Sequence, residues 1–166
     1  MWERLLVEAY ARAPRRVGRA AVRATTPSYR VGVVAVAVRP DGRVLLVDQS
    51  YVEGWSLPGG DLRRGESLRD GLARELREEL GLRLDVATPE LAVQRVHDHW
   101  VTFVAPLRLD DATADALRPS PPELTGLGWF DAADLPRVHD DAGPPLRLGL
   151  RWLAGGDGSG AAGRSG

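Results

Sequence analysis

The spacing of hydrophobic residues along this chain alternates between strand-like and helix-like, and the changes mark the predicted elements. The apolar run at 31–38 predicts a buried strand, followed by a Pro-Asp-Gly turn at 40–42. The run at 43–49 predicts its hairpin partner. A loop over 49–54 and a short strand over 55–57 follow, running into a Gly-Gly turn. This part of the chain therefore supplies strands to a sheet.

The next segment has helical spacing, and both of its ends carry capping residues. Ser67 is a good N-cap, with Asp70 three residues later to complete an approximate capping box. Gly81 suits the left-handed residue that ends a helix. The predicted helix spans 68–80. At about 100° per residue its glutamates share one face and its leucines lie beside it, so the leucines can pack on a sheet while the carboxylates face a rim.

Beyond this helix the pattern predicts more strands than helices. Two strands at 91–96 and 99–109 are expected to pair antiparallel, and a last strand lies at 127–130. The polar, proline-containing segment 110–122 predicts a long loop. A short C-terminal helix is expected at 145–153. A mixed sheet with helices on its faces is typical of the α/β class, as a sandwich.

The two ends of the chain stand apart from this pattern. Residues 2–12 have helical periodicity, and we expect a helical arm over 1–27 that packs on the domain. The alternative for this basic amphipathic segment is binding to an anionic membrane or nucleic acid. The Gly-rich residues 154–166 predict a disordered tail. One domain, 28–153, is expected between them.

Composition excludes several classes of function. At 166 residues the chain can bury a proper core as one domain. A net charge of −1 creates no field that recruits nucleic acid or a membrane. The absence of cysteine and lysine excludes disulfides, thiol nucleophiles, Cys-based zinc sites and Schiff-base chemistry. No apolar run approaches 18 residues, so no stable membrane insertion is expected, and the predicted location is the cytoplasm.

The stretch 60–82 carries the most specific pattern: Gly, five residues, Glu, seven residues, then Arg-Glu-apolar-x-Glu-Glu-x-Gly-apolar. A chance match in this chain is roughly one in a million. Its like charges at helical spacings of three and four repel each other by a few tenths of a kcal/mol per pair. A Glu-rich helical face is usually only solvated surface, but the flanking residues at fixed spacing favour a divalent-cation site here.

This stretch resembles the Nudix box of the Nudix hydrolases, with no departure from the pattern. The resemblance spans roughly 28–153 and implies a Nudix-type α/β/α sandwich with a mixed β-sheet. It implies an enzyme that uses Mg²⁺, with Mn²⁺ as an alternative, to cleave a diphosphate bond in a nucleoside diphosphate linked to another moiety. The implied partner is a small molecule and not nucleic acid, and a homodimer stays open.

Two other functions within the same superfamily are considered. A non-catalytic nucleotide-sensing Nudix module is the alternative, although such modules usually show eroded boxes. A metal-dependent isomerase of prenyl diphosphates would need a cysteine, which this chain lacks. The complete box therefore favours the hydrolase.

The resemblance assigns the metal to the glutamates of the predicted helix. It implies that Glu75, Glu78 and Glu79 bind the ion together with the carbonyl of Gly59, and that Glu75 helps to deprotonate water. Glu123 is similar to a glutamate outside the box that binds metal or acts as base in some members, so it is the second catalytic candidate.

The remaining residues of the box are expected to be structural. Gly60 and Gly81 shape the turn and the helix end. Arg74 is expected to hold Glu66, or to orient Glu75, by a charge-assisted hydrogen bond.

Aromatic residues near the box are candidates for binding a nucleobase. Tyr51 and Trp55 are the predicted substrate-binding residues; Trp100 and Phe103 are further candidates. Tyr51 is favoured because Trp55 and Phe103 suit a partly buried position. The substrate itself is not readable from the sequence.

The triplet His97-Asp98-His99 offers two histidines on one strand face that could bind zinc, but no third ligand is evident nearby, so a plain strand start is favoured. Asp98 is a secondary candidate for the base.

Overall fold

The computed structural model describes residues 28–84, 92–97 and 100–155. The predicted arm at 1–27, the Asp98–His99 pair and residues 156–166 lie outside the described residues. The elements are, in chain order, β1 (Arg30–Val38), β2 (Val44–Gln49), β3 (Trp55–Ser56), β4 (Gly59–Asp61), α3 (Leu68–Leu80), β5 (Ala92–His97), β6 (Trp100–Arg108), α4 (Asp111–Ala116), β7 (Leu124–Phe130) and α5 (Gly143–Gly155).

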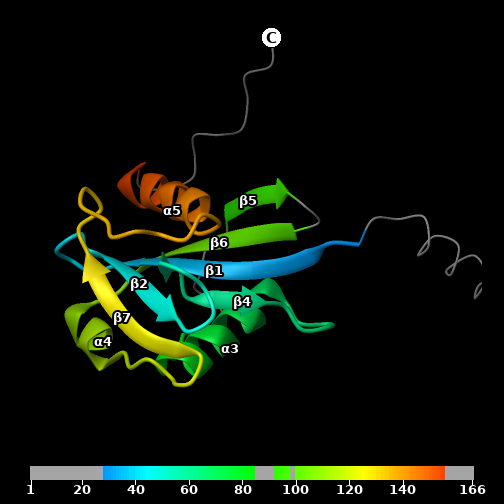
Figure 1. Ribbon diagram of the computed structural model, residues 1–166, viewed down its shortest axis with the longest axis horizontal. Coiled ribbons are helices and arrows are strands. Elements are labelled where there is room, and N and C mark those ends of the chain that lie inside the picture. Colours follow the sequence, from blue (N-terminus) through cyan, green and yellow to red (C-terminus); the bar gives the residue numbers. More distant parts are fainter. Residues whose placement is uncertain (1–27, 85–91, 98–99, 156–166) are drawn as a thin grey trace, which may run out of the picture.

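The seven strands form one mixed sheet (Figure 1). Its order is β3-β2-β1-β6-β5, with β4 paired to β1 and β7 paired to β2. β1 and β6 are parallel along their whole length, whereas the other strand pairs are antiparallel. β1 and β2 pair only at Val38↔Val44, beside the turn that joins them, and then diverge. The predicted hairpin therefore has paired strands only next to its turn.

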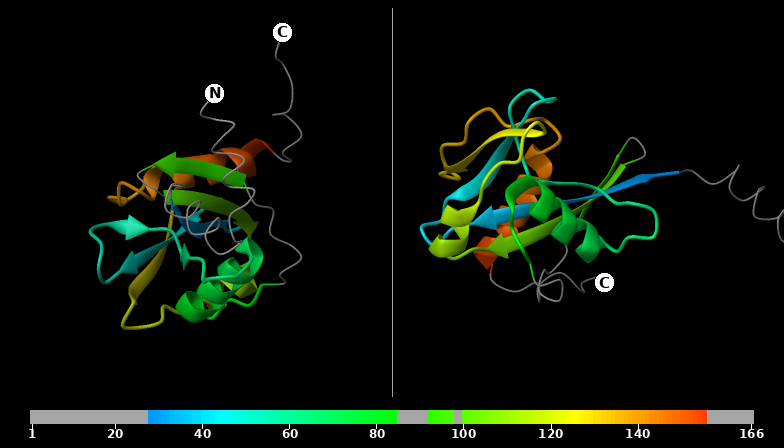
Figure 2. Two further views of the ribbon diagram at one scale, coloured as in Figure 1. Left: turned by 90° about the vertical axis from the view of Figure 1, so that its right-hand side faces the viewer. Right: turned by 90° about the horizontal axis from the view of Figure 1, so that it is seen from below.

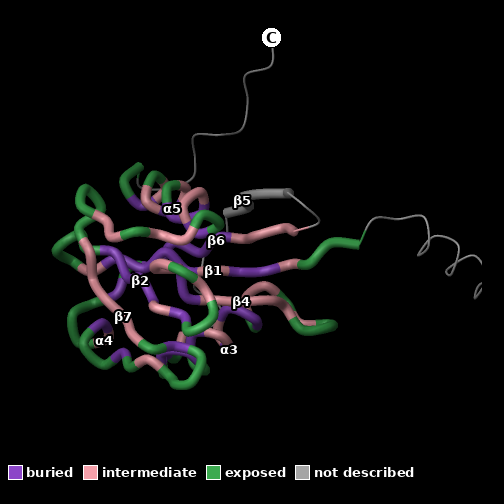
Figure 3. Tube along the Cα trace, in the orientation of Figure 1, coloured by how far each residue is buried: buried purple, intermediate pink, exposed green. Residues whose placement is uncertain are grey.

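Helices cover both faces of the sheet (Figure 2). Successive side chains of a strand point to opposite faces, so β1 serves two cores. Val33, Ala35 and Ala37 belong to the core under α3 and α4, whereas Val36 and Val38 belong to the core under α5. Figure 3 shows the central strands as the buried part of the molecule. The predicted α/β/α sandwich is confirmed.

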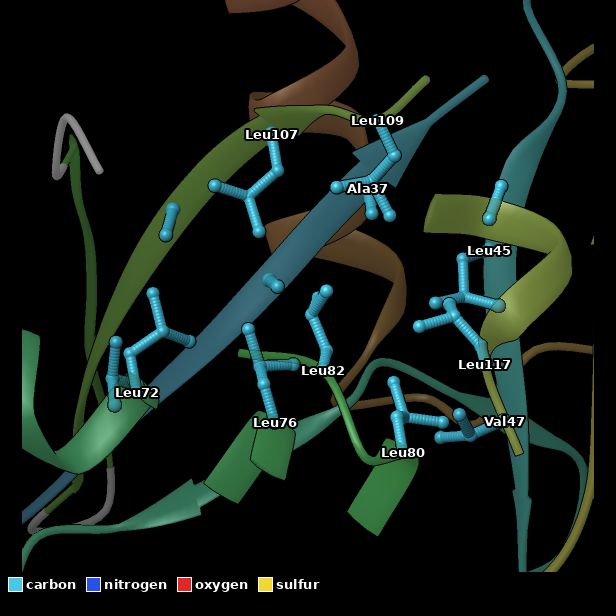
Figure 4. Close-up of a cluster of buried hydrophobic side chains, with 14 of the residues drawn as sticks. Ala37, Leu45, Val47, Leu72, Leu76, Leu80, Leu82, Leu107, Leu109 and Leu117 are labelled. Carbon is cyan, nitrogen blue, oxygen red and sulfur yellow. The ribbon is translucent and has the colours of Figure 1, made fainter. Parts of the chain in front are cut away.

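Helix α3 has the predicted bounds and caps. Ser67 accepts a hydrogen bond from the Asp70 backbone amide, and Gly81 ends the helix at φ 70°. Leu72, Leu76 and Leu80 are at most 1% exposed and point from α3 towards the sheet (Figure 4). Packing these leucines fixes which face of the helix is left for its carboxylates.

Three sequence-based expectations are wrong. The predicted loop at 110–122 contains α4, which Asp110 caps by accepting from the Thr113 amide and which buries Ala114. The Gly-Gly turn is strand β4, because Gly59 to Asp61 pair with β1. Helix α5 begins two residues early and extends to Gly155, so residues 154 and 155 are helix and not tail.

Candidate active site

A pocket of about 430 Å³ collects residues from distant parts of the chain. Its walls come from β1, β4, β6, α3, the end of β2 with the loop after it, the residue before β7 and the segment that leads into α5. Its volume falls within the range of small-molecule sites. Gly59, Gly60, Glu75, Glu123 and Tyr51, all singled out from the sequence, line it.

Glu79 is a buried carboxylate beside this pocket. Its exposed fraction is 3%, and the Gly59 amide donates to its Oε2 at 2.8 Å. Burial raises the pKa of Glu79 to about 8, assisted by the negative charges of Glu75 and Glu123, while the hydrogen bonds from Gly59 and Gln49 oppose the rise. The buried Glu79 carboxyl, with two negative side chains near it, therefore favours its neutral form.

Two glycines of β4 allow close approaches: Gly59 lies against β1, and Gly60 lies against the Glu75 side chain of α3. Gly59 has φ 136°, and a Cβ there would lie 2.2 Å from the carbonyl oxygen of Val33. A Cβ at Gly60 would lie 2.7 Å from Oε1 of Glu75. A side chain at Gly59 would displace the backbone of β1, so glycine is required there, whereas a side chain at Gly60 would push the Glu75 carboxylate aside.

Replacing Gly59 by alanine is expected to lower the free energy of unfolding by about 2–3 kcal/mol, because left-handed strain adds to the clash with β1. Gly65→Ala is the matched control: Gly65 has φ 81°, and a Cβ there would have no heavy atom within 4 Å, so only the backbone strain of about 1 kcal/mol applies. Urea unfolding of both variants measures the difference. Equal losses would show that the close approach of Gly59 to β1 carries no cost.

Arg74 is the centre of the ion-pair network in the box. It is 8% exposed, and its Nε and Nη2 donate to the two oxygens of Glu66 at 2.7 and 2.8 Å. Its Nη1 donates to Glu75 at 2.6 Å and its Nη2 to the carbonyl of Asp61 at 3.1 Å. The bidentate pair lowers the pKa of Glu66 to about 2. Arg74 therefore both holds Glu66 and orients Glu75.

Glu78 takes a different position from the other glutamates of α3. Its side chain is 44% exposed and its Oε2 lies 3.3 Å from Arg63 and 3.4 Å from Arg74. Within the described ranges, no three Asp, Glu or His side chains already stand close enough to hold a metal ion. Glu75 and Glu78 are turned onto arginine, so coordination by either would exchange that contact for the ion.

Glu123 lines the pocket and follows a loop whose backbone is hydrogen-bonded to α3. The Ser120 amide donates to the Glu79 carbonyl at 2.9 Å and the Arg118 amide to the Leu80 carbonyl at 3.1 Å, so this loop covers the end of α3. The Ser50 amide donates to the Glu123 carbonyl at 3.0 Å. Tyr51 lies next to Glu123, and burial together with that charge raises its pKa.

The aromatic candidates separate into two groups. Trp55 packs edge-on against Phe130 with ring centroids 4.7 Å apart, and it is not among the described residues that line the pocket. Trp100 lines the pocket, whereas Phe103 packs against the core under α3.

Sequence reasoning missed several pocket residues, among them Gln49, Arg30 and His139. Gln49 is 7% exposed, and the register of β2 with β7 shifts between Asp48 and Gln49. Its position as a polar residue at the end of an apolar strand was a weak indication that it belongs to the site. His139 reaches the pocket because its amide donates to the Trp55 carbonyl at 2.8 Å, a contact between residues far apart in the sequence.

A protein-family comparison identifies the fold and the box together. The family model described as NUDIX domain matches residues 28–153. The chain belongs to the Nudix hydrolase family. A Nudix hydrolase of the MutT type from Burkholderia pseudomallei is 31% identical, with 75% of this chain and 97% of that chain covered and a TM-score of 0.60.

Among curated Nudix relatives, a MutT-like protein of Streptomyces ambofaciens is 43% identical over 60 residues, which are 36% of this chain and 39% of the relative. The 8-oxo-dGDP phosphatase of Homo sapiens is 31% identical over 65% of this chain and 35% of its own length. The chain thus spans little more than a third of these curated relatives. No helix in the described part of this Nudix protein is long and apolar enough to cross a membrane.

The raised pKa of Glu79 in the Nudix box predicts a pH-dependent stability. The pKa of the Glu79 carboxyl rises from its ordinary value of 4.5 in the unfolded chain to about 8 in the folded protein. Between these values the folded state binds more protons, so the free energy of unfolding falls as pH rises. Without divalent ions, the melting temperature of the wild type is expected to fall relative to Glu79→Gln as pH rises from about 5 to about 8. Parallel curves would contradict the buried, protonated carboxyl.

Proposed function

We propose that this Nudix protein is a Mg²⁺-dependent pyrophosphohydrolase that cleaves the diphosphate bond of a small nucleoside diphosphate derivative. The observation that carries the proposal is Glu79, a carboxylate only 3% exposed that neighbours Glu75 and Glu123 beside a pocket of ligand size. A hard divalent cation would offset the negative charge of these carboxylates, because it binds carboxylate oxygens and substrate phosphates at the same time.

The chemistry of these donors fits Mg²⁺ or Mn²⁺. Glu75, Glu79 and Glu123 would hold the ion, with the carbonyl of Gly59 and the more exposed Glu78 as further proposed ligands. When bound, the metal neutralises charge on the diphosphate and lowers the pKa of a coordinated water.

The side chains of the protein would divide the remaining work. Glu75, oriented by Arg74 at 2.6 Å, would accept the proton of the attacking water, and Glu123 is the alternative base because it lines the same pocket. The carboxylate of Glu79, fixed by the Gly59 amide at 2.8 Å, would position the metal end of the site. Tyr51 beside Glu123 would contact the substrate close to its phosphates.

A direct assay tests the activity. Nudix relatives are named for 8-oxo-dGDP, CTP and ADP-ribose, so these three compounds form the panel, with products identified by mass spectrometry. Hydrolysis of at least one compound is expected with Mg²⁺, loss of activity with EDTA and recovery with Mg²⁺ or Mn²⁺. Turnover that survives complete chelation would overturn the metal assignment. Binding of a nucleotide without any cleavage would favour the non-catalytic nucleotide sensor.

A further inference from the structure

One wall of the pocket carries a stacked pair that the proposed chemistry leaves unused. The guanidinium of Arg30 lies over the ring of Trp100, 4.4 Å from its centroid, and both residues line the pocket. The carboxylate of Asp61 forms an ion pair with Nη2 of Arg30. The Arg30 side chain is 65% exposed, so one face of its guanidinium rests on the indole and the other is accessible.

The sheet itself sets this arrangement. Arg30 and Trp100 are directly paired in the parallel β1–β6 ladder, and Gly32 of β1 is paired with Asp61 of β4. Three strands thus bring the three side chains together at one end of β1. A Cβ on Gly32 would lie 3.4 Å from Nε1 of Trp100 and 3.6 Å from Oδ1 of Asp61, so glycine leaves room for both.

Resting on the proposed function, we propose that the Arg30–Trp100 pair is the surface on which the nucleobase of the substrate stacks, with purines favoured over pyrimidines. Bases stack on arginine planes and on aromatic rings, and a guanidinium is weakly hydrated, so its outer face is readily covered. A purine covers more of such a surface than a pyrimidine does.

The charges in the pocket argue that this wall takes a base and not a phosphate. The positive charge of Arg30 is already paired with Asp61, which leaves a flat surface with little net charge. Glu79 interacts with both Glu75 and Glu123, and these carboxylates mark the end where a metal would hold the diphosphate. Tyr51 is next to Glu123 and so belongs to the phosphate end, although the sequence favoured it for the base.

Binding of nucleoside monophosphates tests the stacking surface without any need for catalysis. The probes are AMP, CMP and ribose 5-phosphate, which share a phosphate but differ in the base, and their affinities are measured by titration calorimetry with Mg²⁺ present. The wild type is expected to bind AMP about tenfold more tightly than ribose 5-phosphate, a difference of about 1.4 kcal/mol, because only AMP carries a base that can stack. CMP is expected to fall between them.

The variants are Trp100→Ala, Trp100→Phe and Arg30→Lys. Trp100→Ala is expected to remove the preference for AMP over ribose 5-phosphate, whereas Trp100→Phe keeps most of it and covers the case in which the alanine variant does not fold. Arg30→Lys keeps the positive charge but lacks the planar guanidinium, so its preference for AMP over ribose 5-phosphate is expected to be several-fold smaller. A preference for AMP that persists unchanged in Trp100→Ala would overturn the proposal, and so would a preference that is unchanged in Arg30→Lys if the alanine variant does not fold.

The chain offers a matched control in a second stacked pair. Arg39 lies over Trp129 at 5.3 Å from the ring centroid, and neither residue is among the described residues that line the pocket. Arg39→Lys is therefore expected to leave the AMP preference unchanged; an equal loss in this variant would also overturn the proposal. Hydrolysis that fails on every diphosphate while the AMP preference behaves as expected would reject the proposed function and leave the stacking surface standing.

Discussion

Replacing Glu79 by glutamine is expected to lower kcat about a hundredfold or more, with folding intact. Glutamine keeps the shape of the side chain and can still accept the hydrogen bond from the Gly59 amide. It removes the carboxylate that would bind a divalent cation at a position only 3% exposed. Rate constants at saturating Mg²⁺ on one substrate, with melting curves of both proteins, measure the effect.

Glu53→Gln provides the control for this substitution. Glu53 is also a glutamate, but its side chain is 85% exposed, pairs with Arg137 and is not among the described residues that line the pocket. Its kcat is expected to stay within about twofold of wild type, because an exposed ion pair contributes little. Near wild-type turnover in Glu79→Gln would mean that the metal set is misassigned and that catalysis depends on other carboxylates such as Glu123.

Replacing Arg74 by leucine is expected to lower the free energy of unfolding by about 3–5 kcal/mol, because one partner of a buried ion pair is removed and Glu66 is left without it. Activity is expected to fall as well, since Glu75 loses the donor that orients it at 2.6 Å. Urea unfolding and kcat on one substrate measure both effects. The stabilisation from Glu66 is expected to disappear as pH falls from about 4.5 to about 2, because its folded pKa is depressed.

Arg63→Leu is the control for Arg74→Leu, because it also removes a paired arginine, but an exposed one. Arg63 also pairs with Glu78, but its side chain is 64% exposed, so the expected loss is below about 1 kcal/mol. Equal losses in Arg63→Leu and Arg74→Leu would show that the buried network has no special weight.

Local signals made much of the fold predictable from the sequence. The bounds of α3 follow from Ser67 and Gly81, whose capping roles act within a few residues. α4 was missed because the three prolines that follow it and its polar composition suggested a loop, although Asp110 and Thr113 form a cap. β4 was missed because adjacent glycines usually mark a turn, whereas here they permit pairing close to β1.

The site was predictable only where its residues lie in one motif. The sequence grouped the glutamates of α3, yet it could not show that the Glu78 side chain is 44% exposed while Glu79 is buried. Gln49 and His139 enter the pocket through pairing between strands and loops that are distant in the chain. Such neighbours depend on tertiary structure, which no local pattern encodes.

The divergence of β1 and β2 has a consequence for the order in which the protein folds during synthesis. β2 meets β1 at one residue pair only, and its full-length partner is β7, about 80 residues later in the chain. Until residues 124–130 leave the ribosome, β2 has an unpaired edge that can associate with other chains. Glu123 arrives immediately before that strand. The site is therefore completed only when nearly the whole domain has been made, and truncated chains are expected to aggregate rather than to retain partial activity.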